Sequence, residues 1–176
     1  DPTDEKRLRK ALSEQTEIHG PSHSSPRRIG VMLARLLIDK GELVEAERLL
    51  RLEHSVLAEE NPNDRARLRR SSTNLALSDL RRGDAERALR RLRMVEPSEQ
   101  DDLQSRAHWH AMLGAALGSS GRAEQAADEL ERALEIEAEN SGPDSARSLL
   151  YLDALGMVLT RTDRRERALQ VARRLV

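Results

Sequence analysis

The sequence repeats one pattern four times, and this internal repetition constrains the fold more than any other feature. In each copy a small residue directly follows a Leu, a turn residue comes seven positions later, and an Ala comes five positions after the turn. The turns recur at intervals of 42, 38 and 42 residues while the spacing within each copy stays fixed, so chance is a poor explanation. The four copies are Leu33, Ala34, Gly41 and Ala46; Leu75, Ala76, Gly83 and Ala88; Leu113, Gly114, Gly121 and Ala126; and Leu155, Gly156, Asp163 and Ala168.

Each copy predicts a helix, a tight turn and a second helix. Apolar residues of 27–40 recur at three and four positions, as on one face of a helix, and Gly41 ends that helix where a left-handed backbone is needed. Apolar residues of 42–60 show the same period, and Ala46 is small enough to let the two helices approach closely. One hairpin cannot bury so large an apolar face alone, so neighbouring hairpins must stack. The sequence therefore predicts an all-α fold, a right-handed α-solenoid of stacked antiparallel helix hairpins.

Proline-containing linkers separate the hairpins. Proline cannot continue the preceding helix, and a Ser or Asp that directly follows it can cap the next one. We expect a single repeat domain over 1–176, with both ends inside a repeat, as in a segment of a longer protein. Residues 1–19 are predicted to be the second helix of a partial repeat. The helix hairpins are predicted at 27–60, 64–95, 101–139 and 144–176, and the linker prolines are Pro21, Pro62, Pro97 and Pro143.

The composition argues against several classes of function. With 30 Lys+Arg against 31 Asp+Glu the formal net charge is -1, so a general polyanion binder is not expected. The absence of Cys excludes thiolate metal sites and a cysteine nucleophile, and one Trp, one Tyr and no Phe leave an aliphatic core. The apolar runs are too short for a transmembrane helix, and the first residues lack a secretory signal. We therefore expect a cytoplasmic protein without membrane contact, and the high Arg and Ala content is compatible with a bacterial source.

The small residues at matching points of both helices resemble the tetratricopeptide repeat family, whose minimal unit is about 34 residues. The longer spacing, the long second helices and the linkers at 19–23 and 141–144 resemble the kinesin-light-chain-like subclass, which also occurs in bacterial signalling proteins. The fragment 74–76, Asn-Leu-Ala, is similar to the first-helix core of that subclass. The family's bulky aromatic positions are mostly Leu, Ser or His here, and the linker at Pro97 is short. The resemblance implies a protein-binding or peptide-binding module, a scaffold, sensor or regulatory part of a signalling protein, with no catalysis and no cofactor.

The resemblance also implies that partners bind in a concave groove lined by the first helices. The formal charges of residues 27–40 and 64–82, the predicted first helices of two hairpins, add up to +7. The predicted second helices at 42–60 and 122–139 have formal charges of -4 and -5. A partly basic groove favours a partner with an acidic segment, through charge-assisted hydrogen bonds from Arg. The alternative interpretation is that these arginines solvate helix faces and pair with acidic neighbours. The candidate partner-binding residues carried over from the family are Arg28, Arg35, Arg70, Asn74, Leu77, Arg81, His108, Met157 and Arg161.

One family variant, the carboxylate clamp for the C-terminal tails of heat-shock chaperones, is not expected. It requires a Lys and an Asn in its first repeat, an Asn in its second, and a Lys with an Arg in its third. Of these only Asn74 is retained, and its amide can still bond the backbone of an extended peptide. The other clamp positions are occupied by Val31, Arg35, His108 and Met112.

Neither metal binding nor enzyme chemistry is predicted. His108 and His110 are two residues apart on a predicted helix and so face different ways, while Gly and Pro separate His19 from His23. The sequence has no phosphate loop, nucleophile elbow, zinc-helix motif or dinucleotide fingerprint. Nucleic-acid binding by the Arg-rich run 65–70 is disfavoured because no aromatic platform accompanies it. The alternative function is self-association, as a structural solenoid segment of a multidomain protein or as a homo-oligomer, through apolar residues near the chain ends.

Overall fold

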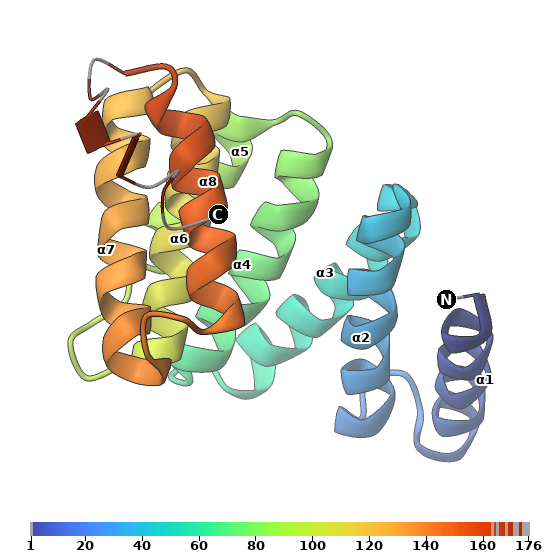
Figure 1. Cartoon of the computed structure of the whole chain (residues 1–176). Helices are drawn as coiled ribbons and strands as arrows, with labels where there is room; N and C mark the ends of the chain where they lie inside the picture. The colour runs from blue at the N-terminus through green and yellow to red at the C-terminus, as the bar shows by residue number, and fades with distance from the viewer. Residues whose placement is uncertain (1, 163, 165, 168, 171–172, 174–176) are drawn as a thin grey trace. The chain divides into compact units, whose positions relative to one another are not determined.

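The computed structural model of the chain is all-α (Figure 1), and it describes residues 2–162, 164, 166, 167, 169, 170 and 173. This part of the chain contains eight helices and no strand. The predicted turn residue Asp163 and small residue Ala168 of the fourth copy lie outside the described residues, as does much of the predicted last helix. The helices are α1 (Pro2–His19), α2 (Ser24–Lys40), α3 (Leu43–Glu60), α4 (Arg65–Arg81), α5 (Ala85–Arg93), α6 (Leu103–Ser119), α7 (Ala123–Ser141) and α8 (Ala146–Leu159).

The helices form two compact units, residues 1–82 and 83–176. In the first unit α1 packs on α2, α2 on α3, and α3 on α4. In the second unit α5 packs on α6, α6 on α7, and α7 on α8. Within each unit, helices that are adjacent in the sequence therefore pack against each other, which confirms the predicted all-α fold of stacked hairpins.

Each unit has its own aliphatic core. In the first unit the buried residues come from α2 and α3 with Leu75 of α4, and Leu8 and Leu12 of α1 pack against them. The apolar stripe of α1 thus faces the core and is not an open edge. In the second unit the core joins α6, α7 and α8. Trp109 is also buried there, and its Nε1–H donates to the Leu92 carbonyl at 3.0 Å, which ties α6 to the end of α5.

The turns inside the hairpins match the prediction. Gly41, Gly83 and Gly121 have φ of 80°, 81° and 83°, the left-handed region that glycine adopts at little steric cost. After α2 the amide of Gly41 donates to the Ile38 carbonyl at 3.1 Å, and the next amide donates to Leu37 at 2.8 Å. The carbonyls at the end of the helix are thereby satisfied, and the chain reverses within a single turn.

The predicted helix caps directly after the linker prolines are wrong. The residue after Pro21 belongs to a turn, and α2 begins three residues before the predicted position 27, because His23 Nδ1 accepts from the Ser25 amide at 3.2 Å. In every linker the chain needs a further turn before it can enter the next helix, so the cap comes later than the residue after proline. The other three helices that follow a proline linker are capped by Asp64 for α4, Asp102 for α6 and Ser145 for α8.

Candidate functional site

A hollow of about 410 Å³ lies on the first unit, between α2, α3 and α4. The helices α2 and α4, the first helices of two successive hairpins, also contact each other directly. Three of the residues predicted from the sequence, Arg28, Arg70 and Asn74, line this hollow together. Its complete lining is Ser24, Arg27, Arg28, Val31, Glu53, Leu57, Arg67, Arg70, Ser71 and Asn74.

The rim of the hollow carries positive charge that is not neutralised. Arg28 and Arg70 are exposed, and within the described part of the chain neither has a carboxylate close enough to form an ion pair. Arg67 differs, because its Nε lies 3.2 Å from Asp64 Oδ2. Of these three arginines, Arg67 thus pairs with an acidic neighbour, whereas Arg28 and Arg70 are exposed to solvent without such a pair among the described residues.

The floor of the hollow is polar although it is buried. Arg27 is only 8% exposed; its Nη1 lies 3.5 Å from Glu53 Oε2 and its Nη2 donates to Glu60 Oε2 at 3.4 Å. Ser71 is 4% exposed. Among the residues that the structure describes, neither Ser71 Oγ nor Arg27 Nε has a hydrogen-bond partner. A buried polar group without a partner costs free energy, and the contacts of the described residues do not offset that cost on this floor.

The other predicted residues lie outside the lining of this hollow. On the first unit Arg35 is exposed on α2, Leu77 is half-buried and packs against the core, and Arg81 pairs with Asp39 at 3.9 Å. On the second unit His108 is half-buried on α6, and α8 exposes Met157 and, just beyond its end, Arg161.

Sequence reasoning missed the buried pair Arg27 and Glu53. The family resemblance gave only the outward positions of the first helices, and these two residues lie at inward positions. The signal that could have found them is the occurrence of charged residues where the corresponding positions of the third repeat, Ala107 and Ala133, are small and apolar.

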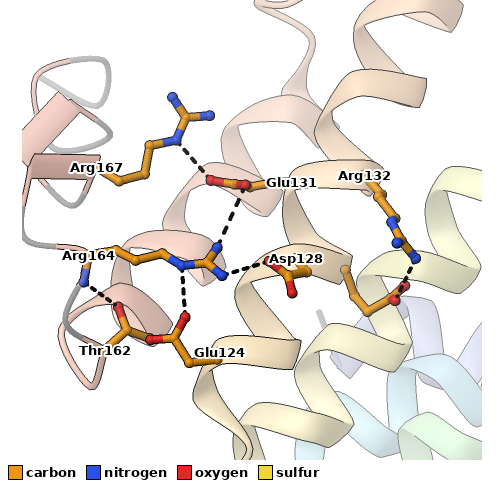
Figure 2. Close-up of polar contacts among 8 residues, drawn as sticks. Glu124, Asp128, Glu131, Arg132, Thr162, Arg164 and Arg167 are labelled. Atoms are coloured by element: carbon orange, nitrogen blue, oxygen red, sulfur yellow. Dashed lines mark hydrogen bonds and ion pairs between the residues drawn. The ribbon is translucent and has the colours of Figure 1, made fainter.

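Arginines at the C-terminal end of the described chain form a contrasting cluster, which Figure 2 shows. Arg164 directs its guanidinium at three carboxylates of α7: Glu124 and Asp128 at 2.8 Å each and Glu131 at 3.9 Å. Arg167 lies 2.8 Å from the same Glu131. The hydrogen bond to Asp128 is the main cause that raises the pKa of Arg164. These guanidinium groups are already neutralised, so the cluster supports the fold and offers no site for an anion.

The histidines do not assemble a metal site. No group of three or more His, Asp or Glu side chains in the described residues could hold a metal ion. His110 Nδ1 lies 2.7 Å from Glu129 Oε2, which links α6 to α7, and the ring of His19 stacks on that of His23 at 4.6 Å. None of the described helices is both long and apolar enough to cross a bilayer.

Comparison with known proteins identifies the repeats. Residues 28–51 and 69–94 match the tetratricopeptide repeat model. A search of curated proteins found no match in sequence. Among solved structures, the chain superposes on a variant of a Podosopora anserina protein described as a kinesin light chain with nearly identical TPR-like repeats. The TM-score is 0.70 and the sequence identity is 19%, over 97% of this chain and 82% of that chain.

Two further solved structures have the same fold. BtubC (BKLC) from P. vanneervenii gives a TM-score of 0.76 at 19% identity over 97% of this chain and 70% of that chain. A double mutant, MamA RS-1 ArsTM, gives 0.56 at 18% identity over 97% of this chain and 92% of that chain. Identities this low establish a common fold and nothing about partners. Residues 28–51 and 69–94 of this chain thus match tetratricopeptide repeats, and the chain has the fold of the kinesin-light-chain-like repeats.

Proposed function

We propose that this chain is a protein-interaction module that binds a segment of a partner protein at the hollow of its first unit. Tetratricopeptide repeats generally mediate protein–protein interaction or act as scaffolds. The observation that carries the proposal is the presence of two exposed guanidinium groups without ion-pair partners, Arg28 and Arg70, beside a hollow with a polar floor. The groups that line the hollow can bind and orient a ligand, and the role assigned to them is recognition.

The charge of the hollow favours an acidic partner. Four arginines and one glutamate line it, so its lining has an excess of positive charge. Charges of one sign in a cleft with low-dielectric walls attract the opposite charge, and Arg binds carboxylates through two parallel hydrogen bonds. In a longer protein such a module would report whether its partner is bound, as a sensor, scaffold or regulatory part of a signalling protein.

The test compares two variants that change the net charge equally. Arg28→Glu/Arg70→Glu reverses the charge at the rim, and Lys6→Glu/Lys10→Glu does so on the exposed side of α1, where Lys10 has only a 3.7 Å pair with Glu14. The probes are a fluorescein-labelled Glu-rich peptide and its Gln counterpart, followed by fluorescence anisotropy. We expect the wild type and the α1 variant to bind the Glu peptide, and the rim variant to lose roughly tenfold or more in affinity. Equal loss in both variants, or equal binding of the Gln peptide, would contradict the proposal.

Self-association is the second candidate, and one observation favours it. On α8 the side chains of Leu149, Leu150 and Met157 are 45%, 67% and 61% exposed. Exposed apolar side chains that are close together often mark an interface. Light scattering on the same samples separates the two candidates, because a discrete dimer that binds no peptide in any variant would favour assembly over recognition.

A further inference from the structure

The two units can be compared residue by residue, because the sequence repeats at the level of two hairpins. Ala34 corresponds to Gly114 and Gly41 to Gly121, which fixes a constant offset of 80 residues between 24–82 and 104–162. Each residue that lines the hollow of the first unit therefore has a counterpart in the second. The comparison shows which side chains each unit has at this place.

In the second unit this place is filled by an aromatic side chain. Ser71 corresponds to Tyr151, which is buried in one apolar cluster with Ala107 and Ala133. Burial, and secondarily the charge of Glu137, raises the pKa of Tyr151 to about 12, so the phenol stays neutral and acts as a filler. A phenol ring thus occupies the position at which the first unit has only a hydroxymethyl group.

In the first unit the positions of those two alanines carry charge. Ala107 and Ala133 correspond to Arg27 and Glu53, whose side chains form the buried pair on the floor of the hollow. A buried ion pair is commonly no more stabilising than well-packed apolar residues, and a serine hydroxyl without a partner adds a further cost. The second unit carries Tyr151 and two alanines at these positions, but it also buries charge here, because Leu57 corresponds to Glu137, which is 1% exposed. Neither Glu137 Oε2 nor the Tyr151 hydroxyl has a hydrogen-bond partner among the described residues. What sets the first unit apart is therefore the small Ser71 side chain, which leaves an arginine-lined hollow where the second unit has an aromatic ring. A local departure from good packing is typical of a functional site.

The volume and the polar groups of the hollow suit a side chain that ends in one negative charge. About 410 Å³ is more than ten times the ~30 Å³ that a water molecule occupies in the liquid, which leaves room for a side chain. Arg28 and Arg70 at the rim supply guanidinium groups, and Ser71 supplies a hydroxyl that can turn between staggered rotamers. Glu53 on the floor repels negative charge, so a singly charged group suits the hollow better than a phosphoryl dianion.

Resting on the proposed function, we propose that the hollow is a recognition pocket for one carboxylate side chain, Asp or Glu, of the bound segment. The carboxylate binds between Arg28 and Arg70 and accepts a hydrogen bond from Ser71. The hollow thereby sets which position of the segment must be acidic, while the rest of the segment lies along α2 and α4.

The test fills the hollow and leaves the arginines in place. Ser71→Tyr introduces the residue of the second unit, Ser71→Leu is a smaller filler, and Ser71→Ala removes only the hydroxyl. The probes are the Glu-rich peptide, its Gln counterpart and a phosphoserine counterpart, and circular dichroism confirms that each variant is folded. We expect both fillers to lower the affinity for the Glu peptide roughly tenfold or more, and Ser71→Ala to lower it a few-fold.

The outcomes separate this inference from the proposed function. If Arg28→Glu/Arg70→Glu loses binding while both fillers keep wild-type affinity, the pocket is refuted and the proposed function stands. If neither the rim variant nor the fillers change the affinity, both are refuted. Tighter binding of the phosphoserine peptide that is lost in the fillers would replace the carboxylate with a phosphoryl group. Should Ser71→Tyr fail to fold, the smaller Ser71→Leu decides between these outcomes.

Discussion

The contact between α6 and α7 is so close at Gly114 that a single methyl group should destabilise the second unit. A Cβ added at Gly114 would lie 2.7 Å from Leu130 Cγ and 3.1 Å from the Ala126 carbonyl oxygen. The Cγ atom is the branch point of a side chain that is only 1% exposed, so it has little room to move away. We therefore expect Gly114→Ala to push the two helices apart and to disturb the core.

The magnitude follows from two opposing terms. Replacing Gly with Ala inside a helix contributes about 1 kcal/mol in favour of folding, and forcing an extra methyl group into a packed core costs about 1–3 kcal/mol. The difference between the two terms is a loss of about 0–2 kcal/mol, and the 2.7 Å approach to Leu130 Cγ puts Gly114→Ala near the upper value. Gly30 provides the control, since its added Cβ would meet only Leu49 Cδ2 at an ordinary 3.5 Å, so Gly30→Ala should stabilise by about 0.5–1 kcal/mol. Gly118→Ala should fall between them, because the nearest atom at 3.2 Å is a terminal methyl of Val158.

Urea unfolding measures this order directly. Far-UV circular dichroism follows the helices of both units, and Trp109 fluorescence follows the second unit, where the indole is buried. From the highest to the lowest urea concentration at the unfolding midpoint, the expected order is Gly30→Ala, Gly118→Ala and Gly114→Ala. The midpoint of Gly114→Ala should lie below that of the wild type. A Gly114→Ala protein that unfolds at or above the wild-type urea concentration would show that α6 and α7 can separate freely, and the argument from close packing would be wrong.

Two further predictions concern ion pairs. A hydrogen bond from Arg9 is the main cause that lowers the pKa of Glu45, and a hydrogen bond from Lys40 is the main cause that lowers the pKa of Glu5. The stability that these two ionised carboxylates contribute is therefore fully present above their ordinary pKa of 4.5. It is lost as the pH falls through their lowered pKa values. Hydrogen exchange should therefore show that, as pH falls below the ordinary carboxyl pKa of 4.5, α1 opens before α3 does. Arg9→Ala should remove the part of this pH dependence that comes from Glu45 and leave the part that Lys40 gives to Glu5. Arg164→Ala should lower the free energy of unfolding by about 1 kcal/mol at low salt and by much less in molar salt. A salt-independent effect would contradict the ion-pair assignment.

The sequence predicted those features of the fold that depend on neighbouring residues. A periodic helix followed by Gly41 predicts a left-handed turn, and the structure has one, because only the local backbone decides that conformation. The helix starts were predicted less well. Where α2 begins depends on which side chain of the linker reaches a free amide, and His23, a residue with a weak preference for that place, is the one that does. Such a choice depends on the path of the linker, which spacing alone does not give.

The candidate site was predicted in part for a similar reason. The positions of Arg28, Arg70 and Asn74 on the first helices follow from the helical spacing once the repeat is known. Arg28 and Arg70 are exposed there, whereas Asn74 is buried. The hollow itself could not be predicted from helical spacing, because its floor brings Arg27 next to Glu53, which lies 26 positions away on another helix. Hydrophobic periodicity treats both as interruptions of an apolar stripe and says nothing of their being partners.

The repeats of one chain nevertheless contain information that a single repeat does not. A hairpin is held together by a few positions, the Leu and small residues that bury its face, and other inward positions are free to pack or to bind. The second unit uses one of these positions for Tyr151 and encloses it in an apolar cluster. The first unit has Ser71 there and leaves a hollow with a charged floor. Both units bury charge at this place, Arg27 with Glu53 in the first and Glu137 in the second, so buried charge alone does not distinguish them. The difference is the arginine-lined hollow beside Ser71, and recognition of an acidic ligand is the role that we propose for it.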